Sequence, residues 1–218
     1  NRLYFDGGGV LTKDSAVTIA LGKAYGGSTV IYTGTSFIIP EDVLNGWKID
    51  GLHYEDIRAR SEKYFEENNV HLLQAELINE NNRLFKEGCE KLGLTVKQFP
   101  INVRGCEGAG VCNLGCPHHA KMGTNEIQLP QAERLGVEVV TNCRVDRLDE
   151  KVCHATVEKA QIGEPSLWEP GEYEVHAKVI VLCAGAVHSP ALLLKSKLRA
   201  KFPALGRYLT LHPALILA

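Results

Sequence analysis

The sequence predicts an α/β fold with a partly parallel sheet. Apolar residues recur at helical spacing at 53–67 and 74–93, whereas 137–148 and 154–162 have the composition of strands. The run "VIVLCAGAV" (179–187) is apolar throughout, which is typical of a strand buried on both faces. Strands mixed with helices indicate the α/β class. With 218 residues, 44% of them hydrophobic, the chain can form one large domain or two small ones.

The first half of the chain changes from loops and strands to helices. Residues 1–50 are rich in Gly, Thr and short apolar runs, which predicts strands and loops with little helix. The segment 53–67 places apolar residues on one helical face. The clearest helix is at 74–93, because Gly93 stands where a C-terminal cap belongs. A loop rich in Gly, Cys and His follows at 100–123.

The second half is predicted to alternate strands and helices. A shorter helix is expected at about 124–135, before the strands at 137–148 and 154–162. The segment "YEVHAKVIVLCAG" (173–185) reads as a strand that ends in small residues. In the helix predicted to follow it, Ser189 is the N-cap and Pro190 the first helical residue.

Charge and cysteine content exclude several classes of partner. A net charge of −2 gives no electrostatic reason to expect nucleic acid or an anionic membrane as a partner. No apolar stretch approaches the roughly 20 residues that span a bilayer, and the first residues, "NRLYFDGGG", show no export signal. The seven cysteines fit reduced thiols better than a disulfide framework. We therefore expect a cytoplasmic protein with no nucleic-acid partner and no membrane span.

Two glycine-rich stretches are candidate ligand sites, and each has a structural alternative. The stretch "GKAYGGSTVIYTGTSF" (22–37) is rich in glycine and hydroxyl groups, so either a ligand lies on its bare backbone or Gly26 and Gly27 form a hairpin turn. Ala184 and Gly185 end the predicted strand with small side chains. That pattern suits a phosphate at the end of a strand or close packing of strand on helix.

Two segments together resemble the signatures of the glucose-methanol-choline (GMC) oxidoreductases. "GKAYGGSTVIYTGT" (22–35) resembles the first signature, and "GAVHSPALLLKSKL" (185–198) resembles the second. "VEVVTNCRVDRL" (137–148) and "LGRYLTLHPA" (205–214) are similar to two further family segments, in the same order. Four matches in sequence order are far more specific than any one of them.

The resemblance implies a Rossmann-like FAD-binding domain with a mixed sheet, helices and a β-rich crossover, followed by the beginning of a substrate domain. The Gly-Gly-Ser loop would follow the cofactor from the pyrophosphate toward the isoalloxazine ring. Val145 would offer backbone contacts to the adenine. The cofactor-binding residues that the resemblance implies are Gly22, Gly26, Gly27, Ser28, Thr29, Tyr32, Val145, Ala184 and Gly185. Tyr32 departs from the family, which usually has Asn there, as do Lys197 and Tyr208 at a usual Gly and Asn.

The resemblance also divides the chain into segments of a longer enzyme. Residues 1–50 would hold the Gly-Gly-Ser loop, 51–136 a helical insertion and the cysteine loop, 137–210 further FAD-binding strands and the crossover, and 211–218 the start of the substrate domain. The family's GxGxxG turn is absent, and its catalytic His is expected beyond Ala218. We expect the chain to be a central fragment that is inactive by itself and binds FAD weakly.

The cysteine loop carries the alternative function. Cys106, Cys112 and Cys116 have spacings of five and three residues, which are poor for zinc and match only the tail of a ferredoxin motif. Metal binding and a redox disulfide both remain open. Long-chain-alcohol and sterol-type branches of the GMC family carry a similar "C-x-G-x-x-x-C-x-x-G-C-x-x-x-x-K" loop, which implies a structured element near the flavin.

The resemblance therefore implies an FAD-dependent oxidoreductase that oxidises an alcohol by hydride transfer to flavin. A small-molecule alcohol is the expected partner, and the electron acceptor and oligomeric state stay open. One alternative is a non-catalytic metal or iron–sulfur module built on the cysteine loop. Another is a nucleotide-binding domain without redox chemistry.

Overall fold

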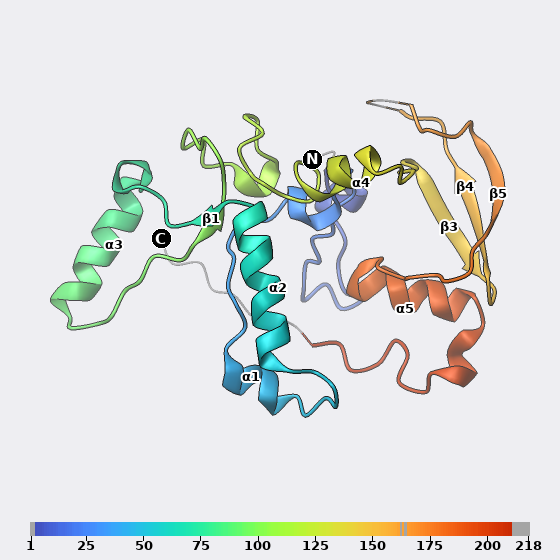
Figure 1. The fold of residues 1–218 in the computed structure, drawn as a ribbon, viewed down its shortest axis with the longest axis horizontal. Coiled ribbons are helices and arrows are strands. Elements are labelled where there is room, and N and C mark those ends of the chain that lie inside the picture. Colours follow the sequence, from blue (N-terminus) through green and yellow to red (C-terminus); the bar gives the residue numbers. More distant parts are fainter. Residues whose placement is uncertain (1–2, 162, 164, 211–218) are drawn as a thin grey trace. The chain divides into compact units, whose positions relative to one another are not determined.

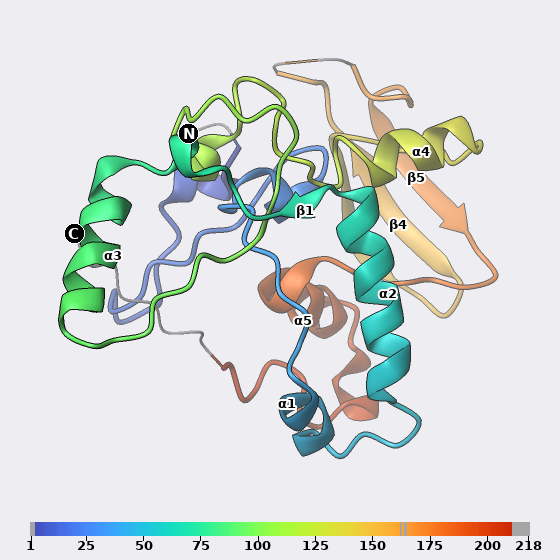
Figure 2. The same ribbon diagram turned by 60° about the vertical axis from the view of Figure 1, so that its left-hand side comes forward.

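The computed structural model (Figures 1 and 2) divides the chain into two units, Asn1–Val137 and Glu138–Ala218. The structure describes residues 3–161, 163 and 165–210. Helices and small antiparallel sheets occur in it, so the α/β class is confirmed. The sheets among the described residues are all antiparallel, and the predicted parallel strand is not among them.

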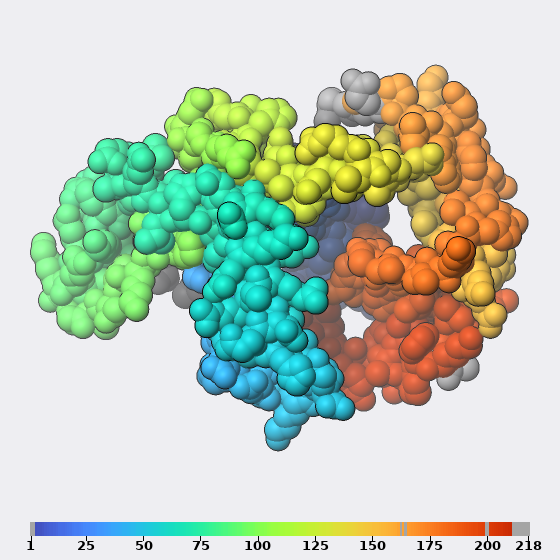
Figure 3. Space-filling model, in the orientation of Figure 1, coloured from blue at the N-terminus to red at the C-terminus, as the bar shows by residue number. Residues whose placement is uncertain are grey.

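Helices make up most of the regular structure of the first unit. The predicted helix at 53–67 is confirmed as α2, Tyr54–Glu67, which contributes to the face of this unit seen in Figure 3. The predicted helix at 74–93 is shorter, because Ile78 is extended and Asn79 caps a new start by accepting from the Asn82 N–H at 2.9 Å. The helices of this unit are η1 (Phe5–Gly8), η2 (Gly27–Val30), α1 (Glu41–Gly46), α2, η3 (Ala75–Leu77), α3 (Glu80–Lys91), η4 (Cys112–Leu114) and α4 (Gln128–Arg134).

The core of the first unit lies where the glycine-rich loop meets the chain after α3. Strands β1 (Val70–His71) and β2 (Ile101–Asn102) are antiparallel, and single bridges join Thr35 to Ile101 and Val103 to Lys121. Among the described residues of this unit, six apolar side chains are buried: Ile31, Leu44, Ile101, Val103, Ala120 and Met122. The predicted ligand loop is therefore anchored on the protein's own core.

The second unit is a three-stranded antiparallel sheet with one helix against it. Strands β3 (Cys143–Leu148), β4 (Val152–Val157) and β5 (Gly171–His176) follow each other as a meander. Helix α5 (Gly185–Lys195) packs on β3, and η5 (Leu198–Lys201) follows it. The Leu148 N–H donates to Ser196 Oγ at 2.8 Å, which fixes the end of α5 to the sheet.

The strand predicted within 179–187 is wrong for the described chain. Strand β5 ends at His176. The segment that follows it is exposed to solvent, since the side chains of Val179 and Val181 are 76% and 79% exposed. A parallel strand needs a hydrogen-bonded neighbour on each side to bury such a run. No described strand supplies one here.

The predicted start of α5 is also wrong. The helix begins at Gly185, with Ala184 as its N-cap, and Ser189 and Pro190 lie inside it. Gly185 has φ of +81° and turns the chain into the helix before the Ser-Pro signal is reached. Pro190, which carries no N–H, leaves one internal hydrogen bond unmade.

Asp146 gives the second unit a specific acid sensitivity. It accepts hydrogen bonds from Arg144 Nε at 2.8 Å and Thr156 Oγ1 at 2.8 Å, and these, the Arg144 bond first, lower its pKa to about 2. A depressed pKa stabilises the fold above the ordinary pKa of 3.8, and this contribution is lost as the pH falls toward 2.

We expect Asp146→Asn to lower the resistance of β3–β5 to urea at pH 7 and to flatten the decline of that resistance between pH 4 and pH 2. Exposed Glu150→Gln serves as the control, and an unchanged acid profile in Asp146→Asn would contradict the assignment.

Candidate functional site

The glycine-rich loop forms a short helix at its Gly-Gly-Ser segment. Gly26 has φ of +94° and caps η2, and the Gly27 N–H donates to the Ala24 carbonyl at 2.8 Å. The alternative hairpin turn is wrong, because a 3-10 helix continues from Gly27 instead of a returning strand. Two successive residues with positive φ make glycine the residue that fits both positions.

Close packing specifies three of the glycines. A Cβ on Gly22 would stand 2.8 Å from Ser28 Cα, and one on Gly26 would stand 2.7 Å from Asn125 Cβ. On Gly123 a Cβ would lie 3.0 Å from the Thr29 carbonyl oxygen. The loop thus rests directly on the backbone of the segment that follows the cysteine loop.

Hydroxyl groups join the same two segments. Thr29 Oγ1 donates to the Gly26 carbonyl at 2.7 Å and lies 2.9 Å from Thr124 Oγ1. Thr124 Oγ1 also donates to the Gly26 carbonyl at 2.9 Å, and its N–H donates to Thr29 Oγ1 at 3.1 Å. Both threonine hydroxyls donate to the Gly26 carbonyl, and Thr29 Oγ1 also accepts from the Thr124 N–H, so the Thr29 hydroxyl is committed to the protein.

The other side of the loop is open. A Cβ built on Gly27 meets no atom within 4 Å, and Ser28 is exposed. Of the loop positions predicted to bind a cofactor, Gly22, Gly26 and Thr29 thus serve the packing of the loop itself. Gly27 and Ser28 present bare backbone and a hydroxyl outward, which is the arrangement that can approach a phosphate or a flat ring edge.

Tyr32, near the end of the glycine-rich loop, contacts the buried Lys121. Burial raises the pKa of its phenol, and Lys121 Nζ lies 5.3 Å from the centre of its ring. That distance is within the range of a cation–π contact. The aromatic ring that replaces the family's usual Asn is thus engaged by the protein's own lysine.

The remaining predicted cofactor residues lie in the second unit. Val145 is 37% exposed on β3, an edge strand, and pairs with Ala155 just before an irregularity in the register. Ala184 and Gly185 are exposed at the start of α5, and a Cβ on Gly185 would meet nothing within 4 Å. The structure brings the six loop residues together in one unit and these three in the other. His212, in the segment "LGRYLTLHPA" that is similar to a family segment, lies outside the described residues.

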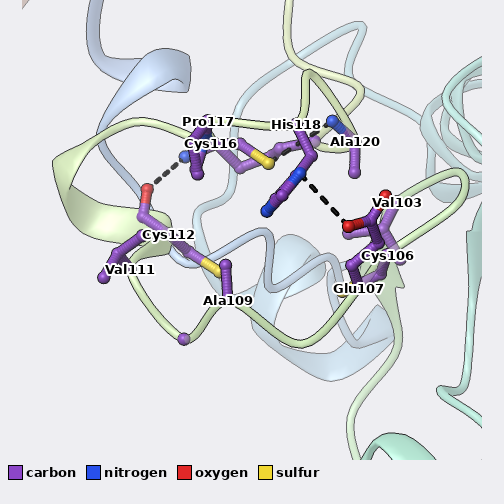
Figure 4. A pocket seen from close by; sticks show the side chains of 12 residues that line it. Val103, Cys106, Glu107, Ala109, Val111, Cys112, Cys116, Pro117, His118 and Ala120 are labelled. Atoms are coloured by element: carbon purple, nitrogen blue, oxygen red, sulfur yellow. Dashed lines mark hydrogen bonds and ion pairs between the residues drawn. The ribbon is translucent and has the colours of Figure 1, made fainter.

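The three clustered cysteines line a small cavity, shown in Figure 4. Its volume is about 30 Å³, and Cys106, Cys112 and Cys116 are all free thiols. The Ala120 N–H donates to Cys116 Sγ at 3.3 Å, and His118 Nδ1 lies 3.3 Å from a Glu107 carboxylate oxygen. Within the described part of the chain, no three His, Cys, Asp or Glu side chains converge as metal ligands would. The geometry therefore adds no support for a metal module.

Comparison with known proteins decides the family. Residues 1–214 match the family model described as GMC oxidoreductase. The chain belongs to the GMC oxidoreductase family. It is 32% identical over 207 residues to an uncharacterised GMC-type oxidoreductase of Mycobacterium tuberculosis, covering 93% of this chain and 32% of that protein. It is 30% identical over 221 residues to a long-chain-alcohol oxidase of Arabidopsis thaliana, covering 98% of this chain and 30% of that protein.

The chain spans about a third of the length of these curated relatives. The resemblance drawn from the two signatures is confirmed. Among the described residues, no helix has the length and apolar character needed to cross a bilayer.

Sequence reasoning missed three residues of this GMC site that bind the loop from the other side. Asn102 and Lys121 are almost fully buried, 2% and 4% exposed, and both make polar contacts to backbone carbonyls. Thr124 joins the loop through the contacts given above. The one signal in the sequence was the Lys that closes the cysteine-loop pattern, which now proves to be Lys121.

Proposed function

We propose that the whole protein is an FAD-dependent oxidoreductase that oxidises an alcohol, and that this chain contributes part of the cofactor's binding site. The observation that carries the proposal is the open backbone at Gly27 and Ser28, within a first GMC signature whose Gly22 and Gly26 pack closely on their neighbours. Bare backbone with open space beside it, next to an exposed hydroxyl, can be approached closely by an extended dinucleotide. Gly185, at the exposed start of α5, offers a second such position.

The roles of the residues follow from this assignment. When bound, FAD supplies the acceptor for the hydride that leaves the carbinol carbon of the alcohol. Gly27 and Ser28 bind through backbone and hydroxyl groups. Val145, Ala184 and Gly185 are assigned to the cofactor by the resemblance to the family. Asn125 supports the loop from its packed side, against Gly26 and Gly123.

The long-chain-alcohol oxidases among the relatives favour a long-chain primary alcohol as substrate. The test is the visible absorption spectrum of the full-length protein before and after anaerobic addition of 1-dodecanol, with dodecane as the control that lacks a hydroxyl. We expect a two-banded flavin spectrum that dodecanol bleaches and dodecane leaves unchanged. Admission of air to the bleached sample then shows whether oxygen can serve as the electron acceptor.

Each other result selects a different function. A flavin spectrum that no alcohol bleaches would keep the cofactor and overturn the substrate class. Binding of ADP without any flavin would favour the nucleotide-binding domain without redox chemistry. A broad charge-transfer spectrum with stoichiometric iron, and no flavin after denaturation, would replace the proposal with the metal module.

A further inference from the structure

Lys121 is a buried cation whose three donor positions are all used on backbone carbonyls. Its Nζ donates to the carbonyl oxygens of Val30 at 2.8 Å, Tyr32 at 2.6 Å and Cys112 at 2.6 Å. The residue is 4% exposed. An ammonium group has three N–H donors and no acceptor, so this arrangement saturates it.

No carboxylate pairs with this ammonium among the ion pairs of the described chain. The neighbouring Glu107 contacts His118, and Glu126 contacts His119. Burial lowers the pKa of Lys121, and the nearby thiols of Cys112 and Cys116 oppose that effect. Burying an ammonium group without a carboxylate partner costs free energy, which its hydrogen bonds must offset. The position of Lys121 Nζ is therefore fixed by the three carbonyls that accept those hydrogen bonds.

The three carbonyls belong to two loops that are far apart in the sequence. Val30 and Tyr32 stand at the end of η2, directly after the Gly-Gly-Ser segment, and Cys112 begins η4 in the cysteine loop. Lys121 thus contacts residues that lie 91, 89 and 9 positions before it in the sequence. We call Lys121 Nζ with these three carbonyls the lysine clamp.

We propose that Lys121 is a positioning residue, which fixes the flavin-binding loop by clamping Val30 and Tyr32 to the cysteine loop. The inference rests on the proposed function for the identity of the ligand. Lys121 is buried, whereas Gly27 has open space beside it and Ser28 is exposed, so the clamp orders the backbone next to the positions proposed to meet the cofactor. Because the Cys112 carbonyl accepts one of the three hydrogen bonds, the cysteine loop has a structural role in the clamp that needs no metal.

The experiment compares Lys121→Met and Lys121→Ala with the exposed control Lys86→Ala, all in the full-length protein. The methionine keeps the length of the stem and removes the donors, which preserves packing, whereas the alanine leaves room for an added amine. The first measurement is hydrogen exchange of the amides of residues 28–33 without cofactor. We expect exchange about 10- to 100-fold faster in both Lys121 variants, the factor for losing a charge-assisted hydrogen bond.

The second measurement separates donor chemistry from packing. Added n-butylammonium is expected to restore most of the protection in Lys121→Ala, because its NH₃⁺ can reach the same carbonyls. Tetramethylammonium at equal concentration carries the charge without N–H donors and is expected to restore nothing. Equal effects of the two cations would overturn the clamp, as would wild-type exchange rates at 28–33 in Lys121→Met.

The third measurement ties the clamp to the cofactor. The dissociation constant for FAD is expected to rise about tenfold or more in Lys121→Met and to stay unchanged in Lys86→Ala. Unchanged FAD affinity together with faster exchange would overturn the positioning role. Absence of FAD binding in the wild-type protein would instead refute the proposed function, and the exchange and amine measurements would still decide whether the clamp exists.

Discussion

Gly26→Ala is expected to unfold the glycine-rich loop and to abolish retention of FAD. The new Cβ would stand 2.7 Å from Asn125 Cβ and 3.0 Å from the Asn125 backbone nitrogen, on a residue held at φ of +94°. Left-handed strain costs about 1–2 kcal/mol and overpacking about 1–3 kcal/mol, so the sum is on the order of 2–5 kcal/mol. The measurements are the thermal midpoint of unfolding and the flavin content of the purified full-length protein.

Gly27→Ala is the matched control, because it adds the same methyl group one residue later. Its φ of +57° also strains an alanine, but the new Cβ meets no atom within 4 Å. We expect a loss of only about 1 kcal/mol in stability. If Gly27 faces the cofactor, FAD affinity should fall more than stability does. Equal losses of stability in the two variants would show that the contact with Asn125 does not constrain the loop.

The contrast between these two glycines marks what the sequence could predict. The two adjacent glycines and the order of the signatures were enough to predict the family and the position of the loop. The different roles of Gly26 and Gly27 could not be predicted from the sequence. The atom that leaves no room for a Cβ on Gly26 belongs to Asn125, about a hundred residues later. The local sequence pattern predicts that glycine is needed at these positions. Tertiary contacts decide which glycine packs against the protein and which has open space beside it.

The same limit explains the secondary-structure errors. Helix α2 was predicted closely because its pattern is local and its ends are polar. The run at 179–187 was predicted as a strand from its composition, but strand formation depends on a neighbour that the described chain does not provide. The start of α5 was misplaced because one left-handed glycine outweighed the Ser-Pro signal.

Asn102→Asp is expected to be among the most destabilising single-atom changes in the first unit. Asn102 is 2% exposed, and its Nδ2 donates to the Met122 carbonyl at 2.7 Å. Its backbone donates to the Gly34 carbonyl at 3.1 Å and accepts from the Met122 N–H at 2.9 Å, so the residue joins three segments. A carboxylate here would face a carbonyl oxygen and remain unpaired, at a cost of about 3–5 kcal/mol.

The pH dependence distinguishes this cause from simple loss of a hydrogen bond. Burial raises the pKa of an unpaired carboxyl above its unfolded value of about 3.9, so the folded variant binds more protons than the unfolded one. The difference in unfolding free energy between Asn102→Asp and wild type should therefore be smallest near pH 4 and grow as the pH rises to 7. Asn81→Asp, on the exposed surface of α3, should stay within about 0.5 kcal/mol of wild type at both values. A difference for Asn102→Asp that is independent of pH would mean that the buried charge is relieved by rearrangement, and that the contact between β2 and Met122 is not rigid.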